Sequence, residues 1–485
     1  MLTEQTHLPP VLAEQLAGLR HLTDGSSDLL AEPFLCGGIS CALVTCEGMI
    51  SNAALSDLVI RPLAELQAVP DSAALFRKIC AERMLTMDKA VVYTFGAVLE
   101  RVYAGFAVLL AEGQTGAVAC GVQGFDRRSI GEPSGETNIL GAHEGFTEAI
   151  RTNLSMLRRR MKTPLLKFEL HPVGRLSRTD TALCYLTDRV PEQLIRRIRE
   201  AITHTELDTL LTTGYLQPFI EEKPDGLFDS VSLTERPDVL CAKLLEGRVA
   251  VFIDGNPFAL VIPKLFAESF QSLDDYSYKP WYAAFIRYVK YGAFFLTLLL
   301  PALYTAVSVH HPELLNSTLL LLLTKAEADE PLSLPLEAIG VLLMYEIIRE
   351  ASLRLPKVVG GAVSILGGLI IGDAAVASGL ISTPMLTVAA IAVTAGFIVP
   401  DLTPAVTLLR LLFVAAGGLW GLSGIGLLGM AVLFALCSTE DYGFPVTAPL
   451  SPLHVRGLRD VLTRIGFRKM QRGNFTVEEY HEQTG

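Results

Sequence analysis

The second half of this chain contains uncharged apolar runs that are too long for an ordinary soluble core. Residues 291–309 (YGAFFLTLLLPALYTAVSV) give nineteen consecutive positions without a charge, which is enough to cross a bilayer as a helix. Further apolar runs are 358–380, 385–399 and 411–437. Residues 1–282 instead have the mixture of an ordinary soluble protein. With 50% hydrophobic and 19% charged residues overall, both a purely soluble enzyme and a chain embedded in membrane throughout are excluded.

Strand-like and helix-like patterns alternate through the soluble half. A strand pair is predicted at 166–173 and 180–187, between helices at 144–162 and 191–212. We therefore expect an α/β (α+β) soluble N-terminal domain of two subdomains, followed by an α-helical multi-span membrane domain. The expected parts are a short extension (1–33), a cytosolic α/β domain (34–262) split near 165, an amphipathic connector (263–282), a transmembrane helical domain (283–437) and a C-terminal tail (438–485).

The orientation of the helical half depends on its flanking charges. Lys279, Arg287 and Lys290 precede the first apolar run, which places the first half of the chain inside. The N-terminus lacks a basic n-region followed by an apolar core, so we expect no cleavable signal peptide. Four runs are clear spans, and the amphipathic helix around LEAIGVLLMYEIIRE (336–350) is a fifth, doubtful one. Five crossings would leave the basic tail 456–472 outside, against the same rule. The sequence leaves this conflict open.

Composition and motifs exclude several classes of function. The net charge of −11 and a pI near 5.4 argue against nucleic-acid binding, which needs a basic face. The eight cysteines lack a CxxC pair, so we expect no metal site and no redox role. The phosphate loop, the nucleophile elbow and the HExxH pair are all missing. We expect a non-enzymatic protein without a cofactor.

Small residues at helical spacing mark close helix packing. Gly368 and Gly372 form one small-xxx-small pair, and Gly417 and Gly421 form another. Such pairs let backbones approach closely in a membrane. They pack helices within one chain or between chains, so self-association through these faces and packing inside the chain both remain open.

Carboxylates at membrane depth are costly and therefore invite a functional interpretation. Glu337 and Glu346 lie among apolar residues of the amphipathic helix, and Asp373 interrupts the run 358–380. We take all three as candidates for lining an ion path. The alternative is that they end spans, cap helices or pair with nearby arginines.

A charged loop stands out in the soluble half, in residues 126–162. It is rich in Gly, Pro and Ser and has interleaved arginines and glutamates. It either binds an anion or a partner, or forms a salt-bridged surface between subdomains or subunits. Its candidate residues are Arg127, Arg128, Glu132, Glu144, Arg151 and Arg158.

Several segments, in unbroken order, resemble the A-subunit family of bacterial spore germinant receptors. They are GFDRRSIGEPSGETNILGAHEGFTEAIRTNLSMLRRRMK, GRLSRTDTALCYLTD, TERPDVLCAKLLEGRVAVFIDGNPFALVIP, FFLTLLLPALYTAVSVHHPELL, LMYEIIREASLRLPKVVGGAVSILGGLIIGDAAV and LCSTEDYGFPVTAPLSP. The resemblance implies a multi-pass protein of the spore inner membrane whose N-terminal domain faces the spore core. It also implies a pentamer-like homo-oligomer that forms a nutrient-gated cation channel triggering exit from dormancy. The implied partners are a transporter-like B subunit and a lipoprotein C subunit.

Three other readings remain beside this one. A paralogue of the family acts with the dipicolinate-release machinery and shares the same motifs. A secondary transporter with a broken helix is a different class, although the chain has no internal repeat of the kind that transporter halves show. A membrane-anchored scaffold is the third, although an anchor alone does not require intramembrane carboxylates.

Overall fold

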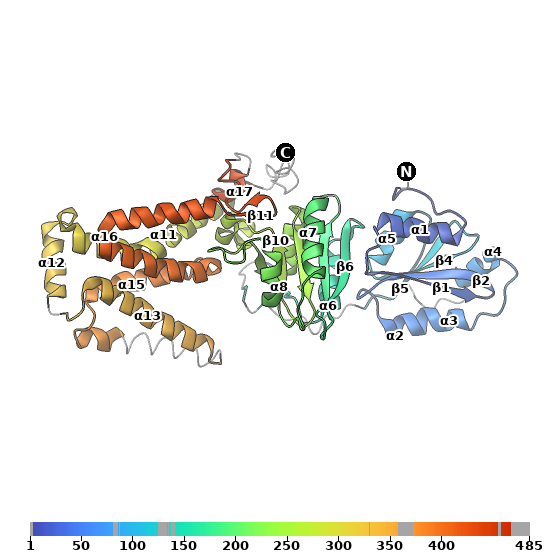
Figure 1. Cartoon of the computed structure of the whole chain (residues 1–485). Helices are drawn as coiled ribbons and strands as arrows, with labels where there is room; N and C mark the ends of the chain where they lie inside the picture. Colours follow the sequence, from blue (N-terminus) through green and yellow to red (C-terminus); the bar gives the residue numbers. More distant parts are fainter. Residues whose placement is uncertain are drawn as a thin grey trace. The chain divides into compact units, whose positions relative to one another are not determined.

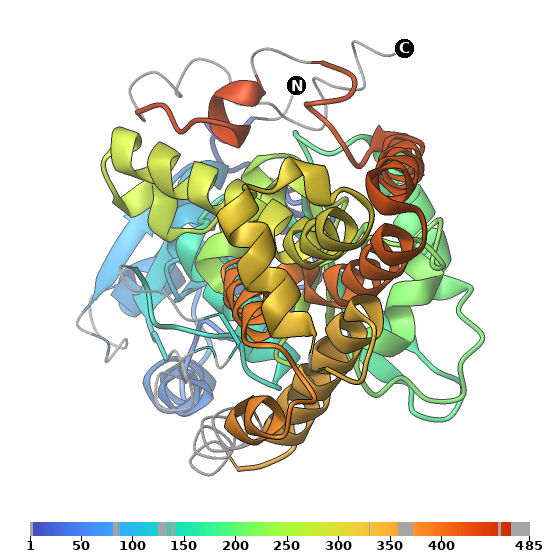
Figure 2. The same cartoon turned by 90° about the vertical axis from the view of Figure 1, so that its left-hand side faces the viewer.

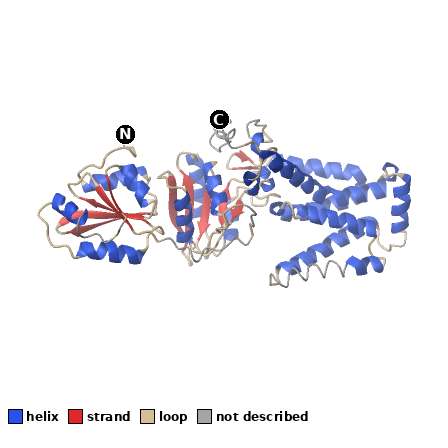
Figure 3. Cartoon of the chain, turned by 180° about the vertical axis from the view of Figure 1, so that it is seen from behind, coloured by secondary structure: helices blue, strands red, loops and turns tan. Residues whose placement is uncertain are grey.

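The computed structural model describes residues 3–80, 86, 88–124, 133, 135–136, 141–328, 330–356, 372–453 and 457–466. The chain divides into two compact units. The first, here called the α/β unit, contains Met1–Pro224 and Asp229–Lys264. The second, the helical unit, contains Asp225–Phe228 and Leu265–Arg472. Figure 3 shows the two large sheets, in red, and the helices, in blue.

The first sheet of the α/β unit is antiparallel and is buried on both faces. Its strands run in the order β1-β2-β4-β5-β3. Ala42 and Val44 of β2 face a core with Leu12 and Phe95, whereas Leu43 faces Leu63 on the other side. Burial of both faces explains why these strands lack polar alternation. The elements are α1 (Leu12–Leu22), β1 (Leu29–Cys36), β2 (Ile39–Cys46), α2 (Asn52–Leu55), α3 (Arg61–Ala64), α4 (Ser72–Lys78), β3 (Lys89–Val92), α5 (Phe95–Val102), β4 (Phe106–Ala111) and β5 (Ala117–Gly121).

The second sheet is also antiparallel, in the order β6-β7-β9-β10-β8. The predicted strand pair is confirmed as β6 and β7, and Gly255, at φ 84°, lies in the predicted hairpin turn between β9 and β10. The helix expected over 191–212 ends earlier, at Thr203. The elements are α6 (Ile150–Arg160), β6 (Leu166–Val173), β7 (Thr179–Leu186), α7 (Glu192–Thr203), α8 (Thr213–Ile220), β8 (Ser232–Thr234), α9 (Pro237–Leu245), β9 (Val249–Ile253) and β10 (Ala259–Ile262).

The boundary between the two sheets lies earlier than expected. Leu154 and Leu157 of α6 pack in one core with Phe168 of β6 and Phe252 of β9. Helix α6 therefore packs on the second sheet, although it lies before the split expected near 165. The sequence pattern missed this because it shows a helix but not the sheet against which the helix packs.

The helical unit packs its long helices around one apolar core, which includes Leu298, Ala338, Met385 and Phe413. Two helical segments, Pro280–His310 and Pro400–Cys437, are long and apolar enough to cross a membrane. Figure 1 labels the helices, and Figure 2 looks toward the end of this unit that contains α12. The elements are α10 (Asp274–Ser277), α11 (Pro280–His310), α12 (Ser317–Glu327), α13 (Leu334–Leu353), α15 (Thr383–Gly396), α16 (Thr403–Cys437), β11 (Glu440–Asp441), β12 (Phe444–Pro445) and α17 (Leu458–Val461).

Helix α16 is broken at Gly421, where φ is 63° and ψ is −146°. A Cβ placed on Gly417 would lie 3.2 Å from Ile425 Cδ1, and one on Gly424 would collide with the Ala416 carbonyl oxygen. The segments 403–420 and 422–437 therefore fold back on each other. The sequence pattern predicted one span over 411–437 and did not indicate this reversal, because the run of uncharged residues continues through it.

Candidate functional site

Glu346 lies between two arginines in the helical unit. Its Oε1 accepts hydrogen bonds from Arg410 Nη2 at 2.8 Å and from Thr407 Oγ1 at 3.2 Å. Its Oε2 lies 2.8 Å from Arg349 Nη2. The Arg410 side chain is 4% exposed and that of Glu346 is 15% exposed. We call Glu346, Arg349 and Arg410 the charged triad; it carries two positive charges against one negative.

Arg410 was missed in the sequence, although a signal was present. Between residues 374 and 437 the chain has only two charged side chains, Asp401 and Arg410. A lone arginine within an apolar run normally pairs with an acidic group on a neighbouring helix. The sequence therefore contains the signal for an Arg410 partner but does not identify Glu346 as that partner.

Glu337 has a different environment, at the start of α13. Its side chain is buried, and its Oε1 accepts hydrogen bonds from Ser382 N at 2.6 Å and Ser382 Oγ at 2.7 Å. Ser382 in turn caps the N-terminus of α15 by accepting from Met385 N. Glu337 thus joins α13 to the residue that caps α15.

The remaining candidates of the helical unit do not gather at one place. Asp373 is exposed and Gly372 is buried near Leu386, while Gly368 lies outside the described residues. A Cβ on Gly417 would lie 2.8 Å from the Ala302 carbonyl oxygen, and one on Gly421 would lie 3.0 Å from His310 Cβ. Both of these glycines therefore allow α16 to pack closely on α11 of the same chain.

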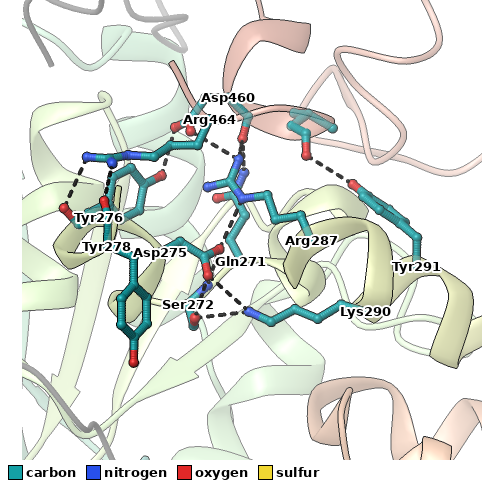
Figure 4. Close-up of polar contacts among 11 residues, drawn as sticks. Gln271, Ser272, Asp275, Tyr276, Tyr278, Arg287, Lys290, Tyr291, Asp460 and Arg464 are labelled. Atoms are coloured by element: carbon teal, nitrogen blue, oxygen red, sulfur yellow. Dashed lines mark hydrogen bonds and ion pairs between the residues drawn. The ribbon is translucent and has the colours of Figure 1, made fainter. Parts of the chain in front are cut away.

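A polar cluster with no counterpart in the sequence predictions surrounds Arg287, which is fully buried near the start of α11 (Figure 4). Its Nε donates to Asp275 Oδ2 at 3.0 Å, and its Nη1 donates to the carbonyl and the carboxylate of Asp460. Lys290 Nζ adds an ion pair with Asp275 at 3.4 Å. Buried charges need such partners, because desolvation is costly.

The same cluster fixes the C-terminal segment to the residues before α11. Arg464 donates to the carbonyl oxygens of Tyr278 at 2.6 Å and Tyr276 at 3.0 Å. Tyr276 Oη donates to Asp460 Oδ2 at 2.7 Å, and Gln271 Nε2 donates to the Asp460 carbonyl at 2.9 Å. We call the residues around Arg287, Asp275, Asp460 and Arg464 the C-terminal clamp.

In the α/β unit, Arg158 connects the subdomain of the first sheet to that of the second. It is fully buried and donates to both carboxylate oxygens of Asp28, at 2.8 and 3.0 Å, and to the carbonyl oxygens of Thr163 and Leu166. Its guanidinium also lies over the Tyr103 and Phe168 rings. Burial raises the pKa of the Tyr103 hydroxyl, while the nearby Arg158 charge opposes that rise.

The other members of the charged loop form surface pairs or lie outside the described residues. Arg151 pairs with Glu47 at 2.5 Å and with Asp180 at 3.6 Å. Glu144 pairs with Arg159 and Arg160. Arg127, Arg128 and Glu132 fall outside the part of the chain that the structure describes. Among the described residues, those of this segment form ion pairs with other residues of the α/β unit.

No group of three His, Cys, Asp or Glu side chains that could hold a metal ion occurs among the described residues. Cys41 is buried on β2, and burial raises the pKa of its thiol to about 12. Such a thiol is a weak nucleophile and a poor metal ligand at neutral pH.

Comparison with known proteins gives the family. The sequence model described as "Bacillus/Clostridium GerA spore germination protein" matches residues 17–474. The chain belongs to the GerA family. This confirms the resemblance found in the sequence.

Two relatives match almost the whole chain, and one solved domain matches about half of it. Spore germination protein KA of Bacillus subtilis is 33% identical over 94% of this chain and 85% of its own length. The uncharacterized membrane protein YfkQ of the same organism is 32% identical over 99% of this chain and 93% of its own. The crystal structure of the N-terminal domain of the A subunit of the Bacillus megaterium germinant receptor GerK3 is 28% identical, with a TM-score of 0.42, over 54% of this chain and 99% of that one.

Proposed function

We propose that this chain is a membrane subunit of a spore germinant receptor and that copies of it assemble into a nutrient-gated cation channel. Membership of the GerA family supports the role in germination. The helical unit would cross the spore inner membrane, and the α/β unit would face the spore core. A transporter-like B subunit and a lipoprotein C subunit would be its partners, and nutrient binding would lead to cation release.

The observation that carries the membrane part of the proposal is the apolar surface of α16. Leucine, methionine, tryptophan and phenylalanine side chains lie exposed along both segments of the hairpin, beyond what a soluble protein tolerates without a covering partner. Lipid or neighbouring copies of the chain would cover them. These exposed residues are Leu408, Leu412, Leu419, Trp420, Leu427, Met430, Leu433 and Phe434.

We infer from the hairpin an orientation that would agree with the flanking charges. The C-terminal clamp holds Asp460 against Arg287 near the start of α11. If α11 crosses the membrane, the tail lies at the end where the chain enters, on the same side as the α/β unit. If both segments of the α16 hairpin cross the membrane, the reversal at Gly421 would add one pass to the five counted from the sequence. An even number of crossings would then agree with the positive-inside rule at both ends.

Homo-oligomerisation and conduction remain proposals of their own. Gly368 and Gly372 would form a face between copies, so Gly368→Leu should shift the detergent-solubilised protein to smaller species. An unchanged size would contradict a subunit contact through that face.

Glu337, Glu346 and Asp373 are the proposed path residues. Of these, Glu346 has its Oε1 atom 3.2 Å from the Thr407 hydroxyl, and these two oxygen atoms would suit a cation once Arg410 withdraws.

Spores that carry Glu346→Gln in place of the native residue test this function. We expect a changed rate of nutrient-triggered germination with unchanged abundance of the protein in the spore membrane. The matched control is Glu350→Gln, because Glu350 is exposed and forms an ion pair with Arg354, outside the charged triad. Loss of the protein would assign Glu346 a structural role, and normal germination by the first variant would contradict its place in the path.

A further inference from the structure

Arg410, the arginine of the charged triad that comes from α16, is incompletely hydrogen-bonded. Arg410 makes one hydrogen bond to Glu346, through Nη2. Its Nε is buried and has no hydrogen-bond partner within the described residues. Arg158 of the α/β unit, in contrast, uses Nε, Nη1 and Nη2 on three different residues. Because fewer bonds must break, Arg410 can leave its partner at lower cost than Arg158 can.

The position of Arg410 also decides what can bind Glu346. Oε1 of Glu346 is the atom that Arg410 and Thr407 share, whereas Arg349, on the same helix as Glu346, approaches Oε2. Withdrawal of Arg410 would leave a carboxylate oxygen beside a hydroxyl oxygen. Hard cations such as K⁺ and Na⁺ prefer oxygen ligands of this kind. With Arg410 in place, the net positive charge of the triad repels them instead.

We propose that Arg410 is a tethered counter-ion that occupies the cation position at Glu346 and keeps the path closed at rest. This inference rests on the proposed function. Opening would then consist of a movement of α16 against α13, because Arg410 and Thr407 lie on α16 and Glu346 lies on α13. Arg410 is thus a positioning and specificity-determining residue, and it acts by competing with the permeating cation for one oxygen atom.

The test is K⁺ efflux from proteoliposomes that contain the purified full-length chain, without any nutrient. We expect Arg410→Gln to raise the resting efflux about tenfold, because it removes a charge at hydrogen-bonding distance from the carboxylate. Arg410→Lys keeps the charge and should stay near the wild-type efflux. Arg354→Gln is the matched control, since its partner Glu350 is exposed and lies outside the triad.

The double variant Glu346→Gln/Arg410→Gln separates a specific effect from a leak through damaged protein. If Arg410 competes with a cation for Glu346, removal of the carboxylate should return efflux toward the wild-type level. Equal K⁺ efflux from the single and the double variant would overturn the inference. It would also be overturned if the wild type conducts K⁺ measurably and folded Arg410→Gln protein shows the same efflux as the wild type. Absence of efflux from wild type and from every variant would overturn the proposed function together with it.

Discussion

Arg287 and Asp460 form an ion pair at 3.1 Å, although 173 residues separate them in the sequence. Arg287 is fully buried at the start of α11, and Asp460 lies on α17 near the end of the described chain. The pair therefore closes the helical unit on itself. It places the last described helix beside the first long one, independently of the order of the helices between them.

Within the C-terminal clamp, the two carboxylates should differ in importance. Asp275 is 2% exposed and pairs with both Arg287 and Lys290, while Asp460 is 28% exposed. Asp275→Asn should destabilise the helical unit by about 3–5 kcal/mol, because it removes the buried carboxylate that Arg287 and Lys290 share. Asp460→Asn should cost less, since the Asp460 carbonyl still accepts from Arg287.

Thermal unfolding of the detergent-solubilised chain measures this difference. Asp401→Asn serves as the control, because Asp401 is exposed and lies outside the clamp. A larger loss of melting temperature with Asp460→Asn than with Asp275→Asn would contradict the assignment.

The reversal in α16 should depend on glycine at position 421. At φ 63° and ψ −146° a side chain is strained, and a Cβ would also approach His310 and His311. Gly421→Ala should therefore cost about 1–3 kcal/mol from backbone strain alone. Gly426→Ala is the matched control in the same hairpin, since a Cβ there meets nothing within 4 Å and alanine favours helix. The yield of monodisperse protein in detergent compares them, and equal yields would refute the hairpin.

Arg158 should be the most sensitive side chain of the charged loop. Arg158→Met leaves the buried Asp28 without its counter-charge, so we expect a loss of about 3–5 kcal/mol. Arg160→Met, which removes a partly exposed pair with Glu144, should change stability by about 1 kcal/mol or less. Hydrogen exchange of β2 and β6 in the full chain reports the difference, and comparable protection in the two variants would count against this account.

Glu169 should make the stability of the second subdomain depend on pH. Burial alone raises the pKa of Glu169, but the His171 ring, with Nε2 3.5 Å from Glu169 Oε2, and hydrogen bonds from Arg199 and Tyr185 outweigh it and lower the pKa below the ordinary 4.5. A lowered folded pKa contributes stability above pH 4.5, and this contribution is lost as the pH falls toward the folded value. Glu169→Gln should cost about 1–2 kcal/mol at neutral pH, with a difference from wild type that shrinks below pH 4.5. Urea unfolding at neutral pH and below pH 4.5 measures this difference in stability between the variant and the wild type. The same difference at both pH values would show that Glu169 is not the titrating group.

The parts of the fold with local signals were predictable from the sequence. Apolar runs bounded by turn residues predicted β6, β7 and the β9–β10 hairpin, because their pairing is between neighbours in the chain. The reversal at Gly421 was not predictable, because an uncharged run has the same composition whether or not it turns, and glycine also occurs in straight membrane helices. The second subdomain began earlier than expected, since the partner of α6 is a sheet formed later in the chain.

The candidate site was predictable only in part. Glu346 was identified as costly at membrane depth, but its partner Arg410 lies 64 residues away. The Arg287–Asp460 pair is more distant still, and each member alone looks like an ordinary flanking charge. Long-range pairing of this kind depends on the packing of helices, which periodicity does not encode.

The central claim is that this chain conducts cations, and planar-bilayer recording of the purified, reconstituted full chain tests it most directly. The account predicts cation-selective currents that change when Glu346→Gln replaces the wild type. Folded oligomer that stays silent, both as wild type and as Arg410→Gln, would contradict it and would leave the helical unit as an anchor or scaffold.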